Sequence, residues 1–202
     1  MRSLREVDGS PVGLRERKKA RTRAAIRQHA MRLFREQGFA ATTVDQIAEA
    51  ADVSQSTFFR YFPTKEAVIL QDDYDPRIIK AFRAQPPELS PIAALRAAFK
   101  QVFAEMSPEE VAEERERHRL ILAVPELYTQ MMDEYTRNVG LVAGLVAERT
   151  GRRPDELAVR TFAGALVGVG MAAMVTWIED PSADFYSVMD GAMAYLEAGL
   201  PL

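Results

Sequence analysis

Apolar side chains recur at helical spacing along most of the chain, in runs separated by proline, glycine and short polar residues. Ile26, Ala30, Leu33 and Phe34 fall at positions i, i+4, i+7 and i+8, which places them on one face of a helix that is predicted to end at Gly38. No stretch alternates with the period of two that is typical of a strand, and no repeat of fixed length is present. The pattern predicts an all-α protein.

Two short helices joined by a tight turn are predicted shortly after this segment. Thr43 and Gln46 have the spacing of a capping box at the start of the first helix. Asp52 can adopt the left-handed conformation that the turn requires. Ser54 is placed to cap the second helix, which is predicted to span residues 55–61. Such a pair of helices is typical of a helix-turn-helix that binds DNA.

The rest of the chain is predicted to consist of helices that begin at prolines or at capping residues. The expected ranges are about 64–73, 75–85, 90–105, 107–123, 125–150, 155–179 and a final helix that ends near 198. One segment, Thr161–Ile178, holds 18 residues without a charge and so meets the length of a membrane span. It is short and rich in alanine and glycine, so a helix packed within protein is favoured over membrane insertion.

Charge is distributed unevenly along the sequence. Residues 1–66 contain 13 Lys and Arg against 8 Asp and Glu, whereas the remaining residues contain 13 against 21. The densest basic cluster precedes the predicted helix-turn-helix, so one positive face is expected to contact DNA phosphates.

Several classes of chemistry have no support in the sequence. There is no cysteine, which excludes disulfides and thiolate zinc sites and agrees with a cytoplasmic location. The two histidines lie far apart, and no phosphate-binding glycine loop or nucleophile elbow is present. We therefore expect no metal, no cofactor and no enzymatic activity.

The segment from residue 15 to residue 65 resembles the TetR family of transcription regulators. The resemblance is carried by AMRLFREQGF, TTVDQIAEAADVS and STFFRYFPTKEAV. It implies an N-terminal three-helix helix-turn-helix domain followed by a larger helical domain for ligand binding and dimerisation. On this basis the chain divides into a flexible arm (1–13), a DNA-binding domain (14–63) and a ligand-binding and dimerisation domain (64–202).

The resemblance also implies a function. The chain is expected to be a cytoplasmic repressor that binds a palindromic, double-stranded DNA operator as a homodimer and is released by a small effector. The alternative is a DNA-binding activator or architectural protein that has no small-molecule effector. A filled core in the C-terminal domain would favour that alternative.

Candidate DNA contacts lie around the second short helix. Gln55, at its N-terminal end, is the best candidate to read a base, since an amide can pair bidentately with adenine. Family members commonly have a phosphate-binding tyrosine where this chain has Phe59, so that hydrogen bond is missing unless Arg60 compensates. The complete set of predicted DNA contacts is Arg15, Lys18, Lys19, Thr42, Thr43, Ser54, Gln55, Ser56, Thr57, Arg60, Tyr61 and Lys65.

The C-terminal half resembles the mycofactocin-system regulators of actinobacteria. The stretch RHRLILAVPELYTQMMDEY, followed by DELAVRTFAGALVG, carries this resemblance. It implies a small apolar effector, with long-chain acyl-CoA as a candidate. The same residues at helical spacing would also fit an ordinary core. The candidate ligand-binding residues are Phe99, Phe103, Met106, His118, Leu120, Leu127, Tyr128, Met131, Tyr135, Asn138 and Phe162.

The last two predicted helices resemble the pair that forms a four-helix dimer bundle in the TetR family. Small residues on both helices would allow close packing between subunits. Packing within one subunit is the alternative interpretation. The residues concerned are Gly164, Ala165, Gly168, Ala172, Ala173, Val188, Ala192 and Leu196.

Overall fold

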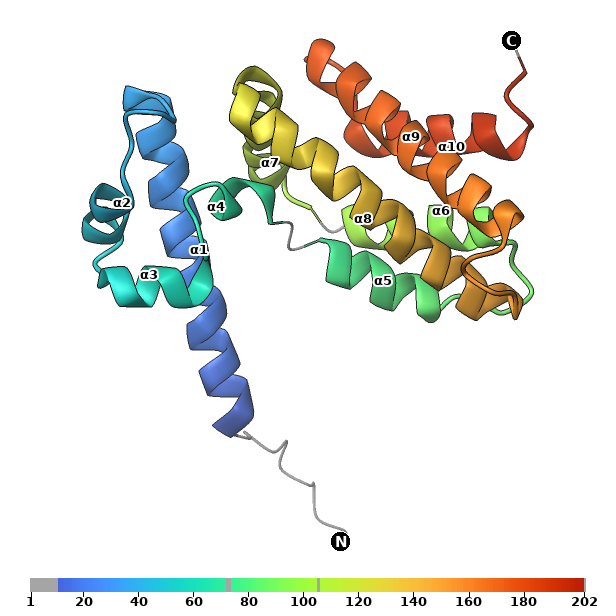
Figure 1. Ribbon diagram of the computed structural model, residues 1–202, viewed down its shortest axis with the longest axis horizontal. Coiled ribbons are helices and arrows are strands. Elements are labelled where there is room, and N and C mark those ends of the chain that lie inside the picture. The colour runs from blue at the N-terminus through green and yellow to red at the C-terminus, as the bar shows by residue number, and fades with distance from the viewer. Residues whose placement is uncertain (1–10, 72–73, 105, 202) are drawn as a thin grey trace, which may run out of the picture. The chain divides into compact units, whose positions relative to one another are not determined.

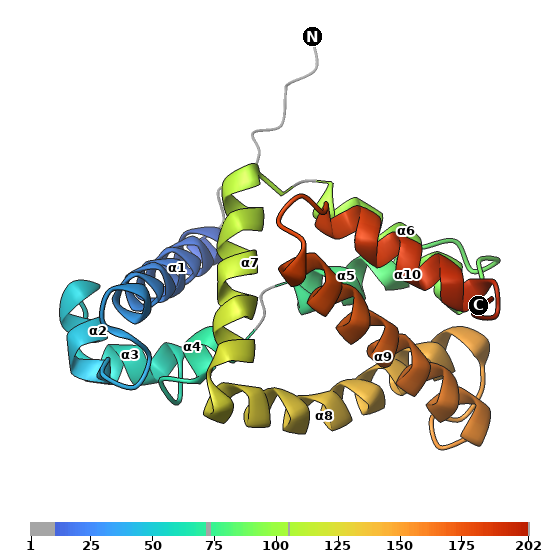
Figure 2. The same ribbon diagram turned by 90° about the horizontal axis from the view of Figure 1, so that it is seen from above.

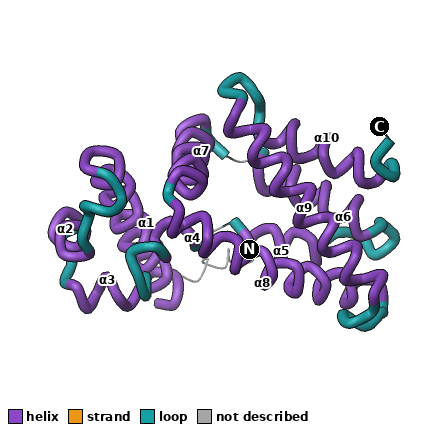
Figure 3. The backbone as a smooth tube through the Cα atoms, turned by 45° about the horizontal axis from the view of Figure 1, so that its top comes forward, coloured by secondary structure: helices purple, strands orange, loops and turns teal. Residues whose placement is uncertain are grey.

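The computed structural model describes residues 11–71, 74–104 and 106–201, and every regular element in these ranges is a helix (Figures 1 and 3). The predicted all-α class is therefore confirmed. The chain forms two compact units, Met1–Gln71 and Asp72–Leu202. Each unit has its own buried apolar residues.

The first unit contains four helices: α1 (Pro11–Gln37), α2 (Val44–Ala50), α3 (Gln55–Tyr61) and α4 (Ala67–Leu70). Helices α2 and α4 pack against α1, and α3 packs against α2. The predicted apolar face of α1 is confirmed for Ile26, Ala30 and Phe34, which are buried. They share this small core with Ile47 of α2 and Phe58 of α3, both fully buried.

The turn chemistry of the helix-turn-helix agrees with the prediction. The Thr43 hydroxyl accepts the backbone N–H of Gln46 at 3.2 Å, and the Gln46 side chain accepts the backbone N–H of Thr43 at 2.9 Å, which completes the capping box. Ser54 caps α3 by accepting the backbone N–H of Thr57 at 3.1 Å. Asp52 has a φ of 52°, and Gly38 has a φ of 86° after α1. These local signals fix where both short helices begin.

The predicted boundaries around this unit need correction. Helix α1 begins at Pro11, so residues 11–13 are helical rather than part of an arm; the remainder of the predicted arm lies outside the described residues. The helix expected at 64–73 is only the four-residue α4. Arg27 donates to the Gln71 carbonyl oxygen at 2.7 Å, and Arg23 donates to the Gln71 side chain at 2.9 Å. These bonds hold α4 on α1, so the first unit extends beyond the expected boundary at residue 63.

The second unit contains six helices in its described residues, and they are shown from above in Figure 2. Helix α9 packs against α7, α8 and α10, while α6 packs against α5, α8 and α10. The helix starts at prolines were predicted correctly, whereas the helix expected from residue 155 begins two residues later. The bounds are α5 (Asp75–Arg83), α6 (Pro91–Phe103), α7 (Pro108–Ala123), α8 (Pro125–Thr150), α9 (Leu157–Glu179) and α10 (Phe185–Glu197).

Ion pairs connect helices that are distant in sequence. Arg96 of α6 contacts Asp190 at 2.8 Å and Glu197 at 2.6 Å, both on α10. The two carboxylates raise the pKa of the Arg96 guanidinium above its ordinary value. Arg83 of α5 reaches Glu148 of α8 at 2.9 Å. These pairs connect α6 to α10 and α5 to α8.

Helix α9 is long and apolar enough to cross a membrane by length and composition alone, and 22% of the relevant 18-residue window is buried. Part of the predicted dimer face instead packs within the subunit. Ala173 is buried in a cluster with Met189 and Met193 of α10. Gly164 accepts a hydrogen bond at 3.4 Å from the hydroxyl of Tyr135 on α8, and a Cβ at Gly168 would lie 3.8 Å from the same oxygen.

The α10 residues of the predicted dimer face also have neighbours within the subunit. Val188, Ala192 and Leu196 are partly buried against the same cluster as Ala173. On α9, Ala172 is exposed and Ala165 is half-buried. Packing within one subunit therefore accounts for most of the small residues in the predicted dimer face. Fewer residues of α9 remain exposed to a partner subunit than the sequence predicted.

Candidate nucleic-acid interface and ligand cavity

Helix α3 has one buried face and one exposed polar face. Phe58 is fully buried and contacts Phe62 with ring centroids 6.0 Å apart. On the other face Gln55, Ser56 and Arg60 are exposed. The N-terminal end of α3, where Gln55 and Ser56 lie, is thus open to a DNA groove, as a reading helix requires.

Phe59 also lies on the outer side of α3, with half of its surface exposed. Its ring meets Phe58 edge-on, with centroids 5.4 Å apart, while Arg60 lies beside the Tyr61 ring at 5.5 Å. Phe59 is therefore not a core residue, although it carries no group that can donate to phosphate. Arg60 is the nearest exposed cation along the helix.

Exposed basic side chains on α1 form a second part of the candidate interface. Arg15, Lys18 and Lys19 are all exposed near the start of α1. Thr43 and Ser54 are exposed at the starts of α2 and α3, where free backbone N–H groups can also bind phosphate. Their exposure leaves them accessible to DNA, and their roles as phosphate contacts stay predictions.

Two predicted phosphate contacts form hydrogen bonds within the fold. Thr42 is buried; its hydroxyl donates to the Gly38 carbonyl oxygen at 2.8 Å and accepts from the Gln37 side chain at 3.1 Å. It is closed to phosphate, so this prediction is wrong. The Lys65 ammonium group donates to the Phe39 and Thr42 carbonyl oxygens at 2.8 and 3.0 Å, leaving it one further donor.

Some basic side chains of α1 are exposed, whereas others form hydrogen bonds within the first unit. Arg23 donates to the Tyr61 carbonyl oxygen at 3.2 Å, and its guanidinium lies 4.5 Å from the centre of the Phe62 ring. Arg27 donates to the Val68 carbonyl oxygen at 3.2 Å. These arginines bind the C-terminal ends of α3 and α4, where carbonyl groups lack helical partners. Charge counting along the sequence could not separate them from the exposed cations.

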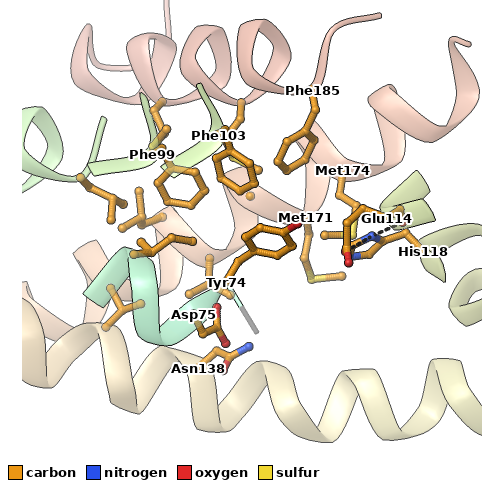
Figure 4. Close-up of a pocket in the computed structure, with 18 of the residues that line it drawn as sticks. Tyr74, Asp75, Phe99, Phe103, Glu114, His118, Asn138, Met171, Met174 and Phe185 are labelled. Carbon is orange, nitrogen blue, oxygen red and sulfur yellow. Dashed lines mark hydrogen bonds and ion pairs between the residues drawn. The ribbon is translucent and has the colours of Figure 1, made fainter. Parts of the chain in front are cut away.

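A cavity of about 310 Å³ lies inside the second unit, within the size range of small-molecule sites (Figure 4). All six helices of the unit contribute to its lining. Seven predicted residues line it: Phe99, Phe103, Met106, His118, Met131, Tyr135 and Asn138. The prediction is wrong for the other four: Leu127 is fully buried, Tyr128 is exposed, and neither Leu120 nor Phe162 is among the lining residues.

Sequence reasoning missed lining residues from α5, α9 and α10. Ile78 and Ile79 come from α5, while Met171 and Met174 come from α9 and Met189 from α10. The sequence predicts helix packing for the apolar run of α9, because this helix has no periodic polar face. The sequence pattern alone therefore could not show which side of α9 faces the cavity.

Aromatic rings form a continuous series along the cavity (Figure 4). Phe103 lies at the centre of this series, 5.8 Å from Tyr74, 5.3 Å from Phe99 and 4.8 Å from Phe185 between ring centroids. Phe185 in turn lies 4.7 Å from Trp177. The series gives the cavity an apolar wall of rigid rings, and the methionines of the lining add flexible side chains.

His118 is a buried, neutral group at one side of the cavity. Its Nδ1 lies 2.8 Å from the backbone oxygen of Glu114 and its Nε2 lies 3.3 Å from Arg117, so Nδ1 donates and Nε2 accepts. Burial, with a smaller contribution from the positive charge of Arg117, lowers the pKa of His118 to about 3. Within the described residues no group of His, Asp and Glu side chains suited to a metal ion was found.

Comparison with known proteins identifies both halves of the chain. Residues 26–71 match the family described as bacterial regulatory proteins, tetR family, and residues 89–201 match the MftR C-terminal domain. TcmR of Streptomyces glaucescens, an HTH-type transcriptional regulator, is 31% identical over 93% of this chain and 89% of that protein. A protein of Mycobacterium tuberculosis named for mycofactocin biosynthesis regulation, MftR, is 30% identical over 91% of this chain and 93% of its own length.

Solved structures share the fold. The repressor FadR of Thermus thermophilus, in complex with lauroyl-CoA, has a TM-score of 0.54 at 25% identity and covers 89% of this chain and 95% of its own. A SmeT–triclosan complex has a TM-score of 0.58 at 19% identity, covering 86% and 90% of the two chains.

Proposed function

Because this chain belongs to the TetR family of transcriptional regulators, we propose that it is a cytoplasmic repressor that binds a palindromic DNA operator as a homodimer and is released by a small apolar effector. The observation that carries the effector part of the proposal is the apolar cavity in the unit that matches the MftR C-terminal domain. An activator or architectural protein without an effector would have a filled core, so the cavity favours a ligand-responsive repressor.

DNA binding is assigned to the exposed face of the first unit. Gln55 and Ser56 would contact base edges, while Arg15, Lys18 and Lys19 would contact phosphates. Thr43, Ser54, Thr57, Arg60, Tyr61 and Lys65 complete the proposed set around the two short helices. A dimer would place two such faces on successive half-sites, which is how helix-turn-helix proteins obtain specific affinity.

The exposed side of α9 and α10 is the proposed dimer interface. Val175 of α9 and Tyr195 of α10 are exposed apolar residues, as is Ala172. Covering this side with a second subunit would bury apolar surface that a single subunit leaves exposed.

An acyl chain, as in acyl-CoA, is the proposed effector class. The lining is largely apolar, and Met131, Met171 and Met174 supply side chains that adapt to a flexible ligand. To release DNA the effector must bind more tightly to the conformation that cannot span both half-sites. Gln71 is bound to α1 of the DNA-binding unit, and Tyr74, only three residues later, lines the cavity. The chain therefore links the cavity to the DNA-binding unit through a short segment.

Acyl-CoA thioesters of increasing chain length test this proposal. The melting temperature should rise and the operator complex should dissociate with the same dependence on chain length, since ligands that bind the folded state stabilise it. Met131→Trp, which fills the cavity, should remove both responses while DNA binding persists. Tyr128→Trp is the matched control, because Tyr128 lies one turn earlier on α8 and outside the cavity lining.

The possible failures of this experiment are distinct. Stabilisation by long chains without release of the operator would mean that the cavity binds ligand without regulating DNA binding. A flat response at every chain length would reject acyl chains as the effector class.

A further inference from the structure

The cavity opens to solvent at one side, beside α5 and α8. The exposed members of its lining are Asp75, in the first turn of α5, and Leu141 of α8. Trp177 of α9 and Met193 of α10, each 1% exposed, are among its most buried members. A ligand therefore enters near Asp75 and Leu141 and extends from there toward the buried residues.

Asn138 lies at this opening. It is half-buried, lines the cavity and precedes Leu141 on α8 by three residues, so the two residues share one side of the helix. In Figure 4 its side chain rises from α8 toward Asp75. An uncharged amide group thus lies where a ligand must pass.

Most other polar side chains of the lining already have partners within the protein. The Tyr135 hydroxyl donates to the Gly164 carbonyl oxygen at 3.4 Å. Both ring nitrogens of His118 have partners, and the Glu114 carboxylate lies 2.7 Å from the buried Arg117 guanidinium. These groups contribute to the fold before any ligand binds.

The polar groups nearer the opening differ from Asn138 in the same respect. The Glu134 carboxylate is paired with the Arg137 guanidinium, and Tyr74 and Asp75 also interact with other parts of the chain. The Asn138 side chain makes no hydrogen bond with the residues that the structure describes. An amide has two N–H donors and a carbonyl oxygen that accepts, so Asn138 can exchange water at the opening for a ligand atom.

The chemistry of an acyl-CoA places one particular atom beside this amide. Its head group carries several charged phosphates and stays in solvent rather than entering an apolar cavity of about 310 Å³. The thioester carbonyl joins the head group to the acyl chain, so it lies at the opening when the chain is inside. A carbonyl oxygen accepts hydrogen bonds and matches the N–H donors of Asn138.

We infer that Asn138 is a specificity-determining residue whose side-chain N–H donates to the thioester carbonyl oxygen of the effector. This inference rests on the proposed acyl-chain function and deepens it. The hydrogen bond fixes how far the chain enters, with its hydrocarbon part along the Phe103 series of rings. It also selects acyl chains over alkyl chains of equal length, which have no oxygen at this position.

Two matched ligands provide the test, lauroyl-CoA and S-dodecyl-CoA, because they differ only in the replacement of the thioester carbonyl by a methylene. In calorimetric titrations lauroyl-CoA should bind about three- to tenfold more tightly, the range expected for one net hydrogen bond. Asn138→Leu, which removes the amide at similar volume, should equalise the two affinities. Leu141→Ala is the control, since it alters the same opening without removing a polar group and should weaken both ligands in parallel.

Nuclear magnetic resonance provides a readout that needs no variant. Asn138 is the single asparagine of the chain, so labelling with ¹⁵N-asparagine gives one side-chain amide pair. A proton of this pair should move downfield when lauroyl-CoA binds and should not do so when S-dodecyl-CoA binds.

Three results would each overturn the inference while leaving acyl-chain binding intact. These are equal affinities for the two ligands, a preference for lauroyl-CoA that persists in Asn138→Leu, and equal resonance shifts with both ligands. Failure of both ligands to bind would overturn the inference and the acyl-chain function together.

Discussion

The Lys65 ammonium nitrogen lies 2.8 Å from the carbonyl oxygen of Phe39 and 4.2 Å from the centre of the Phe39 ring. The same group donates to the Thr42 carbonyl oxygen at 3.0 Å. Lys65 thus joins the segment before α4 to the loop between α1 and α2. Lys65 is thus both a predicted phosphate contact and a residue that stabilises the DNA-binding unit.

Lys65→Ala should therefore lower the stability of the DNA-binding unit as well as its affinity for DNA. Hydrogen bonds from a charged donor contribute about 1.5–3 kcal/mol, so the free energy of unfolding should fall by an amount of that order. Urea denaturation measures this loss, and gel shifts on operator and scrambled duplexes should weaken equally. Lys18→Ala is the control, since its exposed side chain should affect affinity only. Unchanged stability in Lys65→Ala would contradict the structural role.

Gln55→Ala should relax sequence preference at one base position. The side chain is exposed at the N-terminal end of α3, and loss of a bidentate base contact costs about 1–3 kcal/mol at that position. Titration of operators substituted one base pair at a time measures the effect. Lys19→Ala should instead weaken every duplex alike and reduce the dependence of affinity on salt. If both variants lose affinity uniformly, Gln55 does not read a base.

Phe59→Tyr should tighten DNA binding without changing sequence preference. The ring is half-exposed, so an added hydroxyl meets no core, and one hydrogen bond to a charged phosphate is worth at most about 1.5–3 kcal/mol. Affinity for the operator and for a scrambled duplex should rise together, with the melting temperature nearly constant. Unchanged or weaker binding would show that position 59 does not lie against the DNA backbone.

His118 should make the protein less stable as the pH falls below neutrality. Its folded-state pKa of about 3 lies below the ordinary value of 6.5, so between these values the unfolded chain binds a proton that the folded chain does not. The free energy of unfolding should fall through this window by at most about 1.4 kcal/mol per pH unit. His118→Gln should flatten the dependence of stability on pH. Equal slopes in the two proteins would contradict the assignment.

Local structure was predictable because it depends on neighbours in sequence. The Thr43–Gln46 capping box, the left-handed Asp52 and the Ser54 cap each satisfy backbone groups within a few residues, so their side chains alone indicate where α2 and α3 begin. The buried face of α1 was predictable for the same reason, since residues spaced at i, i+4 and i+8 share one side of any helix.

The candidate site was predictable only in part. The sequence indicated seven cavity-lining residues, because aromatic and methionine side chains on α6, α7 and α8 are typical of an apolar interior. It could not distinguish Leu127, which is fully buried, from Met131, which lines the cavity one turn later. That distinction depends on which neighbouring helix covers each position.

By itself, the sequence determined the helical class, the helix-turn-helix and the family, since these follow from periodicity, capping residues and short motifs. Only the tertiary structure decided which polar groups remain available for function. Arg23 and Lys65 donate to carbonyl groups brought to them by the packing of other segments, while Gln55 and Arg60 stay exposed. Hydrogen bonds between segments distant in sequence depend on the relative positions of whole helices, which no local pattern specifies.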